Sequence, residues 1–222
     1  MKVLSLVARK GGVGKSTLSI NLAVAAMEAG HRVGVIDLDP QSSLSEWTDR
    51  RTAEEPVVSD VKVNMLPKFI TAGREKLGLD LMFVDTPPAS SDEMDAAILA
   101  ADYVVIPTQA SLFDLRAVAD TVRKCKQVNK PTCVIFNRVG NRAGLGVNTL
   151  RRQLVGVGMP VIDAYIFDRV AFKDSAASGL AVTEYEPLGK AAREVREVFR
   201  TISQQAGLTP SQAPTLSTQK VA

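Results

Sequence analysis

A glycine-rich loop near the start of the chain constrains its fold more than any other feature. The segment Lys10-Gly-Gly-Val-Gly-Lys-Ser-Thr17 follows a β-rich apolar run at 2–8 and precedes a helical pattern at 15–29. Glycine lets the backbone turn sharply and lets its N–H groups approach a ligand without an intervening Cβ. A strand, such a loop and a helix in this order predict a phosphate-binding loop (P-loop).

The rest of the chain repeats the alternation of strand and helix that is typical of a parallel sheet covered on both faces. The predicted strands lie at about 2–8, 32–37, 62–66, 79–85, 103–107, 132–137 and 161–166. The predicted helices lie near 15–29, 41–51, 92–101, 111–128, 144–156, 170–177 and 187–206. We therefore expect an α/β fold with a mostly parallel, twisted sheet of about seven strands. It should form a single domain over 1–206, and 207–222 should be a disordered tail.

Composition excludes several classes of protein. The chain has 222 residues, of which 45% are hydrophobic and 23% charged, as in an ordinary globular protein. Two cysteines, Cys125 and Cys133, cannot build a disulfide framework, and their spacing matches no zinc site. A single histidine, His31, disfavours histidine-based catalysis. With no long apolar run and no signal-peptide pattern, we expect a cytoplasmic protein.

Charge is unevenly distributed, although the net charge is only +3. Residues 46–95 carry 6 basic and 11 acidic side chains, whereas residues 116–152 (the basic block) carry nine basic side chains against Asp120 alone. The basic block predicts a surface that meets nucleic acid. On charge alone, a solvated face without a partner is an equally good interpretation.

The side chains of the loop have distinct expected ligands. Lys15 should reach the β- and γ-phosphates of a nucleotide, Ser16 should ligate Mg²⁺, and Thr17 should donate to the α-phosphate. The N-terminus of the following helix adds its dipole to the backbone N–H groups. The residues of the loop expected to hold the phosphates are Gly11, Gly12, Val13, Gly14, Lys15, Ser16 and Thr17.

The loop departs from the general P-loop pattern at its start. Arg9 stands where the first glycine would be, and Lys10 follows it. This arrangement resembles the deviant Walker A box of the ParA/MinD family of ATPases. The resemblance implies that Lys10 reaches the phosphates of the opposite subunit in an ATP-dependent homodimer. An added cation near the γ-phosphate would offset charge that develops during phosphoryl transfer.

Two carboxylate motifs agree with this resemblance. The run Val35-Ile-Asp37-Leu-Asp39 and the run Leu81-Met-Phe-Val-Asp85 each end a predicted strand. Similarity to the family makes Asp39 the residue that orients the attacking water, so that Lys10, Lys15 and Asp39 are the expected catalytic residues. Asp85 resembles the Walker B carboxylate that holds Mg²⁺. Asp37 either supports the Mg²⁺ shell or caps the following helix.

Two later motifs are candidates for contact with the base. Related ATPases place an asparagine at the end of this strand to bind adenine, which makes Asn137 the candidate here, with Arg138 beside it. Phe167 and Asp168 follow the last predicted strand and should close over the purine. Phe167 fits a place in the apolar core equally well.

The resemblance covers residues 2 to about 206, and the small ParA-type partition ATPases are most similar, because no N-terminal helix-turn-helix domain is expected. It implies a nucleoid-associated ATPase that binds DNA without sequence preference. A ParB- or ParG-like adaptor protein would stimulate hydrolysis and link it to plasmid, chromosome or other cargo. The expected DNA contacts, all from the basic block, are Arg116, Arg123, Lys124, Lys130, Arg142, Arg151 and Arg152.

Two alternatives share the fold. A MinD-like positioning ATPase would need a C-terminal amphipathic helix for lipid, and the segment Gly207-Leu-Thr-Pro-Ser-Gln-Ala-Pro214 has neither an apolar face nor a basic rim. A metabolic ATP-dependent enzyme similar to cobyrinic acid a,c-diamide synthase would need a glutaminase domain with a reactive cysteine. No segment is available for that domain. The sequence does not choose among cargos.

Overall fold

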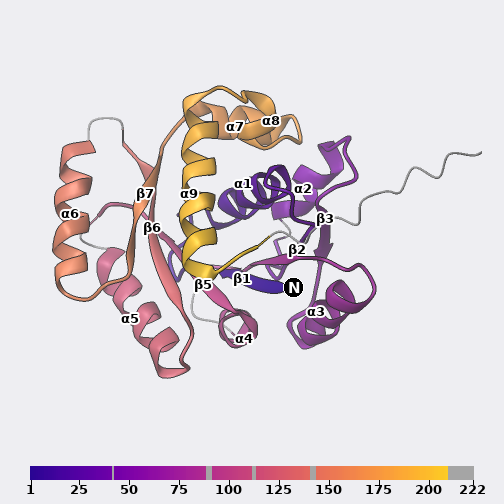
Figure 1. Cartoon of the computed structure of the whole chain (residues 1–222), viewed down its shortest axis with the longest axis horizontal. Coiled ribbons are helices and arrows are strands. Elements are labelled where there is room, and N and C mark those ends of the chain that lie inside the picture. Colours follow the sequence, from indigo (N-terminus) through magenta and orange to yellow (C-terminus); the bar gives the residue numbers. More distant parts are fainter. Residues whose placement is uncertain (42, 89–91, 112–113, 141–143, 210–222) are drawn as a thin grey trace, which may run out of the picture.

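Seven parallel strands form one sheet in the order β3-β2-β4-β1-β5-β6-β7 (Figure 1). The computed structural model describes residues 1–41, 43–88, 92–111, 114–140 and 144–209. The strands are β1 (Lys2–Leu6), β2 (Val33–Asp37), β3 (Val57–Asp60), β4 (Leu81–Asp85), β5 (Tyr103–Thr108), β6 (Thr132–Val139) and β7 (Val161–Phe167). Every strand pair is parallel, so the predicted α/β fold is confirmed.

Helices cover both faces of the sheet. They are α1 (Lys15–Glu28), α2 (Ser43–Arg50), α3 (Leu66–Glu75), α4 (Asp92–Ala100), α5 (Asp114–Gln127), α6 (Gly144–Gly156), α7 (Val170–Ala177), α8 (Val182–Tyr185) and α9 (Lys190–Ala206). One apolar core packs α1, α2, α7, α8 and α9 against one face, and a second core packs α3, α4, α5 and α6 against the other. In Figure 1, α9 runs beside α1, α7 and α8 on one side of the sheet.

Alternation along the strands supplies both cores. Leu4 and Leu6 of β1 enter one core and Val3 enters the other, because successive side chains of a strand point to opposite faces. All residues of β2, β4 and β5 are buried. Each large apolar side chain buried in this way stabilises the fold by about 1.5–3 kcal/mol.

The position of β1 determines where a ligand can bind. β1 lies between β4 and β5, with Leu6 in register with both Asp85 and Val105. The chain therefore leaves β1 at the centre of the carboxyl edge of the sheet. In the next strand pair Asp37 is in register with Asp85. Ligands of doubly wound sheets bind at this edge, where the strand order changes direction.

One predicted strand is wrong. Residues 62–66 do not form a strand; the edge strand is β3, and a 3₁₀ turn at Val63–Met65 leads into α3, which the sequence pattern did not predict. The alternating run from Val61 imitates a strand. Pro67 stands in the first turn of α3, where proline is tolerated because its missing N–H has no helical partner. The short helix α8 was also not predicted, because four residues are too few to show helical periodicity.

The cap that ends α9 lies in the first residues of the predicted tail. Gly207 adopts φ +61°, the left-handed conformation that ends many helices. The N–H of Leu208 donates to the carbonyl of Ser203 at 2.9 Å, and the Leu208 side chain is buried. The rest of the predicted tail, 210–222, lies outside the described residues. Among the helices of the described part, none has the length and apolar character that a membrane span requires.

Candidate nucleotide-binding site

The P-loop connects β1 to α1 with the backbone geometry that its glycines allow. Gly12 has φ +74° and Gly14 has φ +84°, values that are strained for residues with a side chain. The first helical hydrogen bond runs from the N–H of Leu18 to the carbonyl of Gly14 at 2.9 Å. A cavity of 390 Å³ lies over the loop, which we call the phosphate half of the cleft. It is lined by Gly11, Gly12, Gly14, Lys15, Ser16, Thr17 and Asp39, with Pro88 opposite.

Lys15 is a buried cation at the base of this cavity, with 7% of its surface exposed. Burial lowers its pKa, because the charged form loses water, while the carboxylates of Asp85 and Asp39 favour the charged form and oppose that shift. A cation held between two carboxylates beneath a loop of N–H groups is suited to bind phosphate oxygens.

Asp85 is fully buried at the end of β4 and only partly satisfied. Its Oδ1 accepts a hydrogen bond from Ser19 Oγ at 3.2 Å, and its Oδ2 has no hydrogen-bond partner among the described residues. Burial raises the pKa of Asp85 to about 7, against the opposing effects of the Ser16 hydroxyl and the Lys15 ammonium. A buried carboxylate oxygen left unpaired costs free energy, and a hydrated cation beside Ser16 would satisfy it.

The two carboxylates after β2 lie in different surroundings. Asp37 is buried, and its two oxygens accept the N–H groups of Asp39 at 2.8 Å and Leu44 at 3.2 Å. Burial raises the pKa of Asp37 despite these bonds. Because both oxygens are engaged, the geometry favours a cap of the loop and of α2 over a metal ligand. Asp39 is half-buried at the wall of the phosphate half, and its predicted role in orienting water stays a prediction.

A second cavity, of 510 Å³, continues from the first, and we call it the base half of the cleft. The two halves share Gly14, Thr17, Arg50 and Ala176. All four residues predicted for the base line it, namely Asn137, Arg138, Phe167 and Asp168. The tertiary structure therefore brings the ends of β6 and β7 to the P-loop.

Asn137 and Arg138 also support the loop itself. Asn137 is buried, and its Nδ2 donates to the carbonyl of Val13 at 2.8 Å. Arg138 Nη1 donates to the carbonyl of Gly12 at 3.0 Å from a left-handed backbone, φ +55°. These bonds hold the loop over the end of β6. Contact between Asn137 and adenine stays a prediction.

Phe167 packs against the apolar core and also lines the base half of the cleft, while its contact with a purine stays a prediction. Its ring packs edge-to-face on Tyr165, with centroids 5.3 Å apart, and contacts the second core. It also lines the base half, where the guanidinium of Arg169 lies 5.0 Å from the ring centroid. Asp168 is exposed at the same rim, 3.4 Å from Arg138 Nε.

Several residues of the cleft were not predicted from the sequence. They come from α2 and from the segment around α7, and include Trp47, Arg50, Lys173 and Leu180. Each lies in an ordinary amphipathic pattern with no motif around it. Only the packing of α2 and of the segment 170–180 beside the P-loop brings these residues to the cleft.

The side chains of the basic block differ in exposure and in their contacts. Arg116, Arg123 and Arg152 are exposed, and Arg123 also pairs with Asp120 on the same helix at 3.0 Å. Lys124 pairs with Asp95, and Lys130 Nζ donates to the carbonyl of Ala101 at 2.8 Å.

Arg151 is also engaged within the chain. Arg151 pairs with Asp163 at 2.6 Å and donates to the carbonyl of Ile162. Lys124, Lys130 and Arg151 therefore have intramolecular contacts that the sequence did not predict, because their partners are distant along the chain. Arg142 lies outside the described residues.

Comparison with known proteins agrees with this geometry. The chain is 34% identical over 206 residues to "Maintenance of carboxysome distribution protein A" of Gloeobacter kilaueensis, a match that covers 92% of this chain and 93% of that protein. It is 26% identical over 234 residues to "Chromosome partitioning protein ParA" of Caulobacter vibrioides, covering 84% of this chain and 88% of the relative.

Solved structures show the same fold. The septum site-determining protein MinD of Pyrococcus horikoshii, complexed with Mg-ADP, matches with a TM-score of 0.74 at 19% identity, over 95% of this chain and 99% of that one. The family model "CobQ/CobB/MinD/ParA nucleotide binding domain" matches residues 4–182, which include the P-loop, both carboxylate motifs and the base half of the cleft. The chain therefore belongs to the CobQ/CobB/MinD/ParA family of nucleotide-binding proteins.

Proposed function

We propose that this protein is an Mg²⁺-dependent, positioning ATPase of the ParA/MinD type. The observation that carries the proposal is the buried Oδ2 of Asp85, which has no hydrogen-bond partner in the described part of the chain and lies beside a P-loop that presents Lys15. The cleft continues beyond the loop into a second cavity of 510 Å³, which offers room for a base and a ribose. The MinD structure that this chain resembles holds Mg-ADP, which supports the same ligand class here.

The side chains present fit a bound Mg²⁺. Ser16 and Asp85 would hold it, Asp85 through water, as oxygen ligands suit this ion. Bound Mg²⁺ would neutralise charge on the β- and γ-phosphates. The loop N–H groups and Lys15 bind the same phosphates from below.

Hydrolysis then depends on two residues at the rim. Asp39 orients the attacking water, and Lys10 places a second cation near the γ-phosphate, from the opposite subunit of a sandwich dimer. Asp39→Ala should therefore bind ATP and dimerise, yet hydrolyse it poorly. Normal turnover by Asp39→Ala would exclude this role for Asp39.

The first experiment is a titration of the purified protein with ATP and ADP, with and without Mg²⁺, followed by release of phosphate. We expect binding to weaken without Mg²⁺ and turnover to stay below about one per second until a partner is added. Failure to bind either nucleotide would overturn the proposed function.

We further propose that the ATP-bound dimer binds DNA without sequence preference and acts with an adaptor protein to position cellular cargo, in the cytoplasm at the nucleoid. The names of the relatives, one for carboxysome distribution and one for chromosome partitioning, support a positioning role. Exposed cations on α5 and α6 support phosphate contacts. A dimer presents this surface twice, so that two weak patches act together.

Substitution of the exposed cations tests the DNA proposal. Arg116→Glu combined with Arg123→Glu should reduce ATP-dependent retention on duplex DNA at least tenfold at about 0.1 M salt, since each phosphate contact adds to the salt-dependent affinity. Arg74→Glu changes an exposed cation on α3, outside the basic block, and is the matched control. Equal retention by the double variant and the control would remove the basic block from DNA binding.

A metabolic ligase of the same fold is the second candidate, because the matching family also includes CobQ and CobB proteins. Its hydrolysis would depend on a small acceptor molecule and not on DNA. ATP hydrolysis measured with duplex DNA plus a candidate adaptor, and separately with small carboxylate acceptors, distinguishes the two.

A further inference from the structure

The residues shared by the two halves of the cleft, which we call its waist, include a cation that the P-loop motif does not explain. Four described residues line both halves of the cleft, and of these Gly14, Thr17 and Ala176 are uncharged, whereas Arg50 is a cation. In a nucleotide that spans both halves, the groups between the base and the terminal phosphates are the ribose and the α-phosphate. Arg50 lines the cleft where these groups of such a nucleotide would lie, as Thr17 does.

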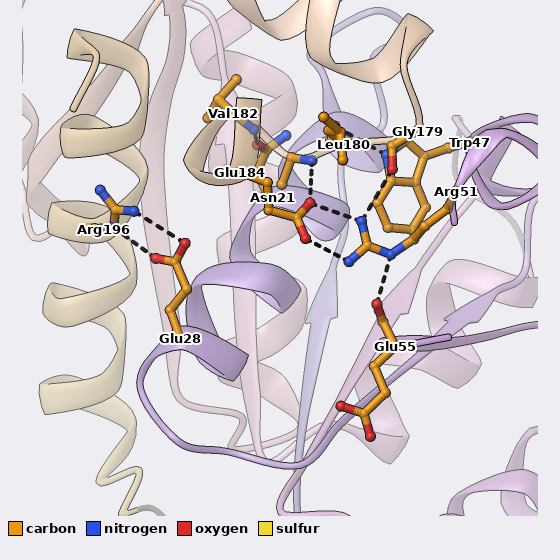
Figure 2. A network of polar contacts seen from close by, with 11 residues as sticks. Asn21, Glu28, Trp47, Arg51, Glu55, Gly179, Leu180, Val182, Glu184 and Arg196 are labelled. Atoms are coloured by element: carbon orange, nitrogen blue, oxygen red, sulfur yellow. Dashed lines mark hydrogen bonds and ion pairs between the residues drawn. The ribbon is translucent and has the colours of Figure 1, made fainter. Parts of the chain in front are cut away.

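Arg50 stands on a helix end that is held in place. The neighbouring Arg51 is buried, with 3% of its side chain exposed, and pairs with Glu184 at 2.7 Å (Figure 2). Arg51 also donates to the carbonyl of Gly179 at 3.1 Å and lies over the ring of Trp47. These contacts join the last turn of α2 to the segment between α7 and α8.

The backbone at the end of α2 approaches Gly179 closely at this joint. A Cβ added at Gly179 would lie 2.5 Å from the carbonyl carbon of Arg50. The indole Nε1 of Trp47 donates to the carbonyl of Leu180 at 3.2 Å, as Figure 2 shows. The contacts that hold the wall carrying Arg50 thus involve no ligand, and a site held in place before binding loses less entropy on binding.

The ion pair between Arg50 and Glu46 is weak, and Glu46 itself lines the cleft. Arg50 lies 3.6 Å from Glu46 on the same helix, and their side chains are 50% and 76% exposed. An exposed pair of this kind contributes little to stability. A phosphate would offer shorter, charge-assisted hydrogen bonds to the same guanidinium. Glu46, which lines the phosphate half of the cleft, therefore competes with a bound phosphate for the guanidinium of Arg50.

We propose that Arg50 contacts the α-phosphate and ribose of the bound nucleotide and that Glu46 is the partner it leaves on binding. This inference rests on the proposed nucleotide binding and names a residue that adds affinity without distinguishing ATP from ADP. Because the contact is to a group that both nucleotides share, Arg50 sets the affinity for both equally.

The fluorescence of Trp47 offers a way to measure nucleotide binding. It is the single tryptophan of the chain and lines the phosphate half, so its fluorescence should report binding. Arg50→Gln should weaken binding of ATP and of ADP by the same factor, roughly tenfold, and Arg50→Lys by less, since lysine keeps the charge but not the fork of donors. Arg200→Gln is the matched control, because Arg200 pairs with Glu197 at 2.6 Å on one exposed helix face away from the cleft.

Glu46→Gln tests the competition. The substitution should raise the affinity for both ATP and ADP a fewfold in the wild-type background and should have no effect on either affinity in Arg50→Gln. Unchanged affinities in Arg50→Gln, or a loss confined to ATP, would overturn the assignment of Arg50 to the α-phosphate. Failure of the wild-type protein itself to bind nucleotide would instead overturn the proposed function. Calorimetric titration repeats each measurement independently of Trp47.

Discussion

The guanidinium of Arg9 lies 3.1 Å from the carboxylate of Asp120, and Arg123 lies 3.0 Å from the other oxygen of the same carboxylate. Asp120 thus links Arg9, which stands in place of the first P-loop glycine, to the exposed Arg123 on α5. Its side chain is 46% exposed, so the pairs contribute at most about 1 kcal/mol to stability. Their larger effect is on the electrostatic potential of this surface, where Asp120 is the one acidic residue of the basic block.

Asp120→Asn should therefore strengthen DNA binding. Removal of this negative charge leaves two guanidinium groups available for phosphates, and retention on nonspecific duplex in the presence of ATP should rise several-fold. The free energy of unfolding should change by less than about 1 kcal/mol. Asp49→Asn, at an exposed acid on α2, is the control. Weaker retention by Asp120→Asn would contradict a direct contact between α5 and DNA.

Lys10→Ala and Lys15→Ala should separate two functions of the loop. Lys10 is exposed at the loop rim, whereas Lys15 is buried at its base. Lys10→Ala should still bind ATP but stay monomeric, because it loses the cation that reaches a second subunit. Lys15→Ala should lose nucleotide affinity by about 100-fold. Light scattering with ATP and with ADP, together with nucleotide titration, checks both. An ATP-induced dimer of Lys10→Ala would remove the case for the sandwich.

Gly14→Ala should disrupt the loop more than Gly12→Ala does. Both glycines have positive φ, so both substitutions strain the backbone by about 1 kcal/mol. A Cβ at Gly14 would also lie 2.6 Å from Asn137 Nδ2, whereas nothing lies within 4 Å of a Cβ at Gly12. Gly14→Ala should therefore displace Asn137 from Val13 and lose nucleotide binding. Thermal unfolding and ATP titration of the two variants measure the difference; equal effects would mean that Asn137 moves aside without cost.

Asp85→Asn should stabilise the protein without ligand while removing its Mg²⁺ dependence. The neutral amide avoids burial of a charge, one oxygen of which has no hydrogen-bond partner among the residues that the structure describes. We expect the free energy of unfolding to rise by about 1–3 kcal/mol at pH 8. ATP affinity should no longer respond to Mg²⁺. Denaturant unfolding with and without Mg²⁺ and ATP checks both parts, and a destabilised Asp85→Asn would show that the carboxylate is needed for folding.

His31 should make stability fall as the pH falls below about 6.5. Burial lowers its pKa, against a smaller effect of Asp80, and its Nδ1 has no hydrogen-bond partner among the described residues. Near pH 6 the unfolded chain therefore binds more protons than the folded one, and protonation favours unfolding. His31→Leu should lack this part of the slope. Because His31 is the only histidine, the difference between the two unfolding profiles isolates it from carboxylates; identical profiles would contradict the prediction.

Local sequence determined the elements and the chemistry of the P-loop. Glycines at 12 and 14 allow the positive φ values that the structure shows, and a lysine and a serine follow at the helix start. Asp85 could be placed at the carboxyl edge because it ends an apolar run. Such features lie within one strand, turn or helix, so that periodicity and backbone conformation are enough to predict them. The same local rules failed at 62–66, where an alternating run belongs to a turn and a helix.

The tertiary structure alone decided which distant residues complete the cleft. Asn137 donates to Val13, 124 positions earlier, and Arg51 pairs with Glu184, 133 positions later. The same packing of α2 against the segment between α7 and α8 brings Arg50 to the waist of the cleft. None of these pairings leaves a local signal, because each depends on which face of a helix packs against the sheet and on the neighbours it meets there. The sequence specifies these contacts only through the whole set of buried apolar side chains that fixes the helices on the sheet.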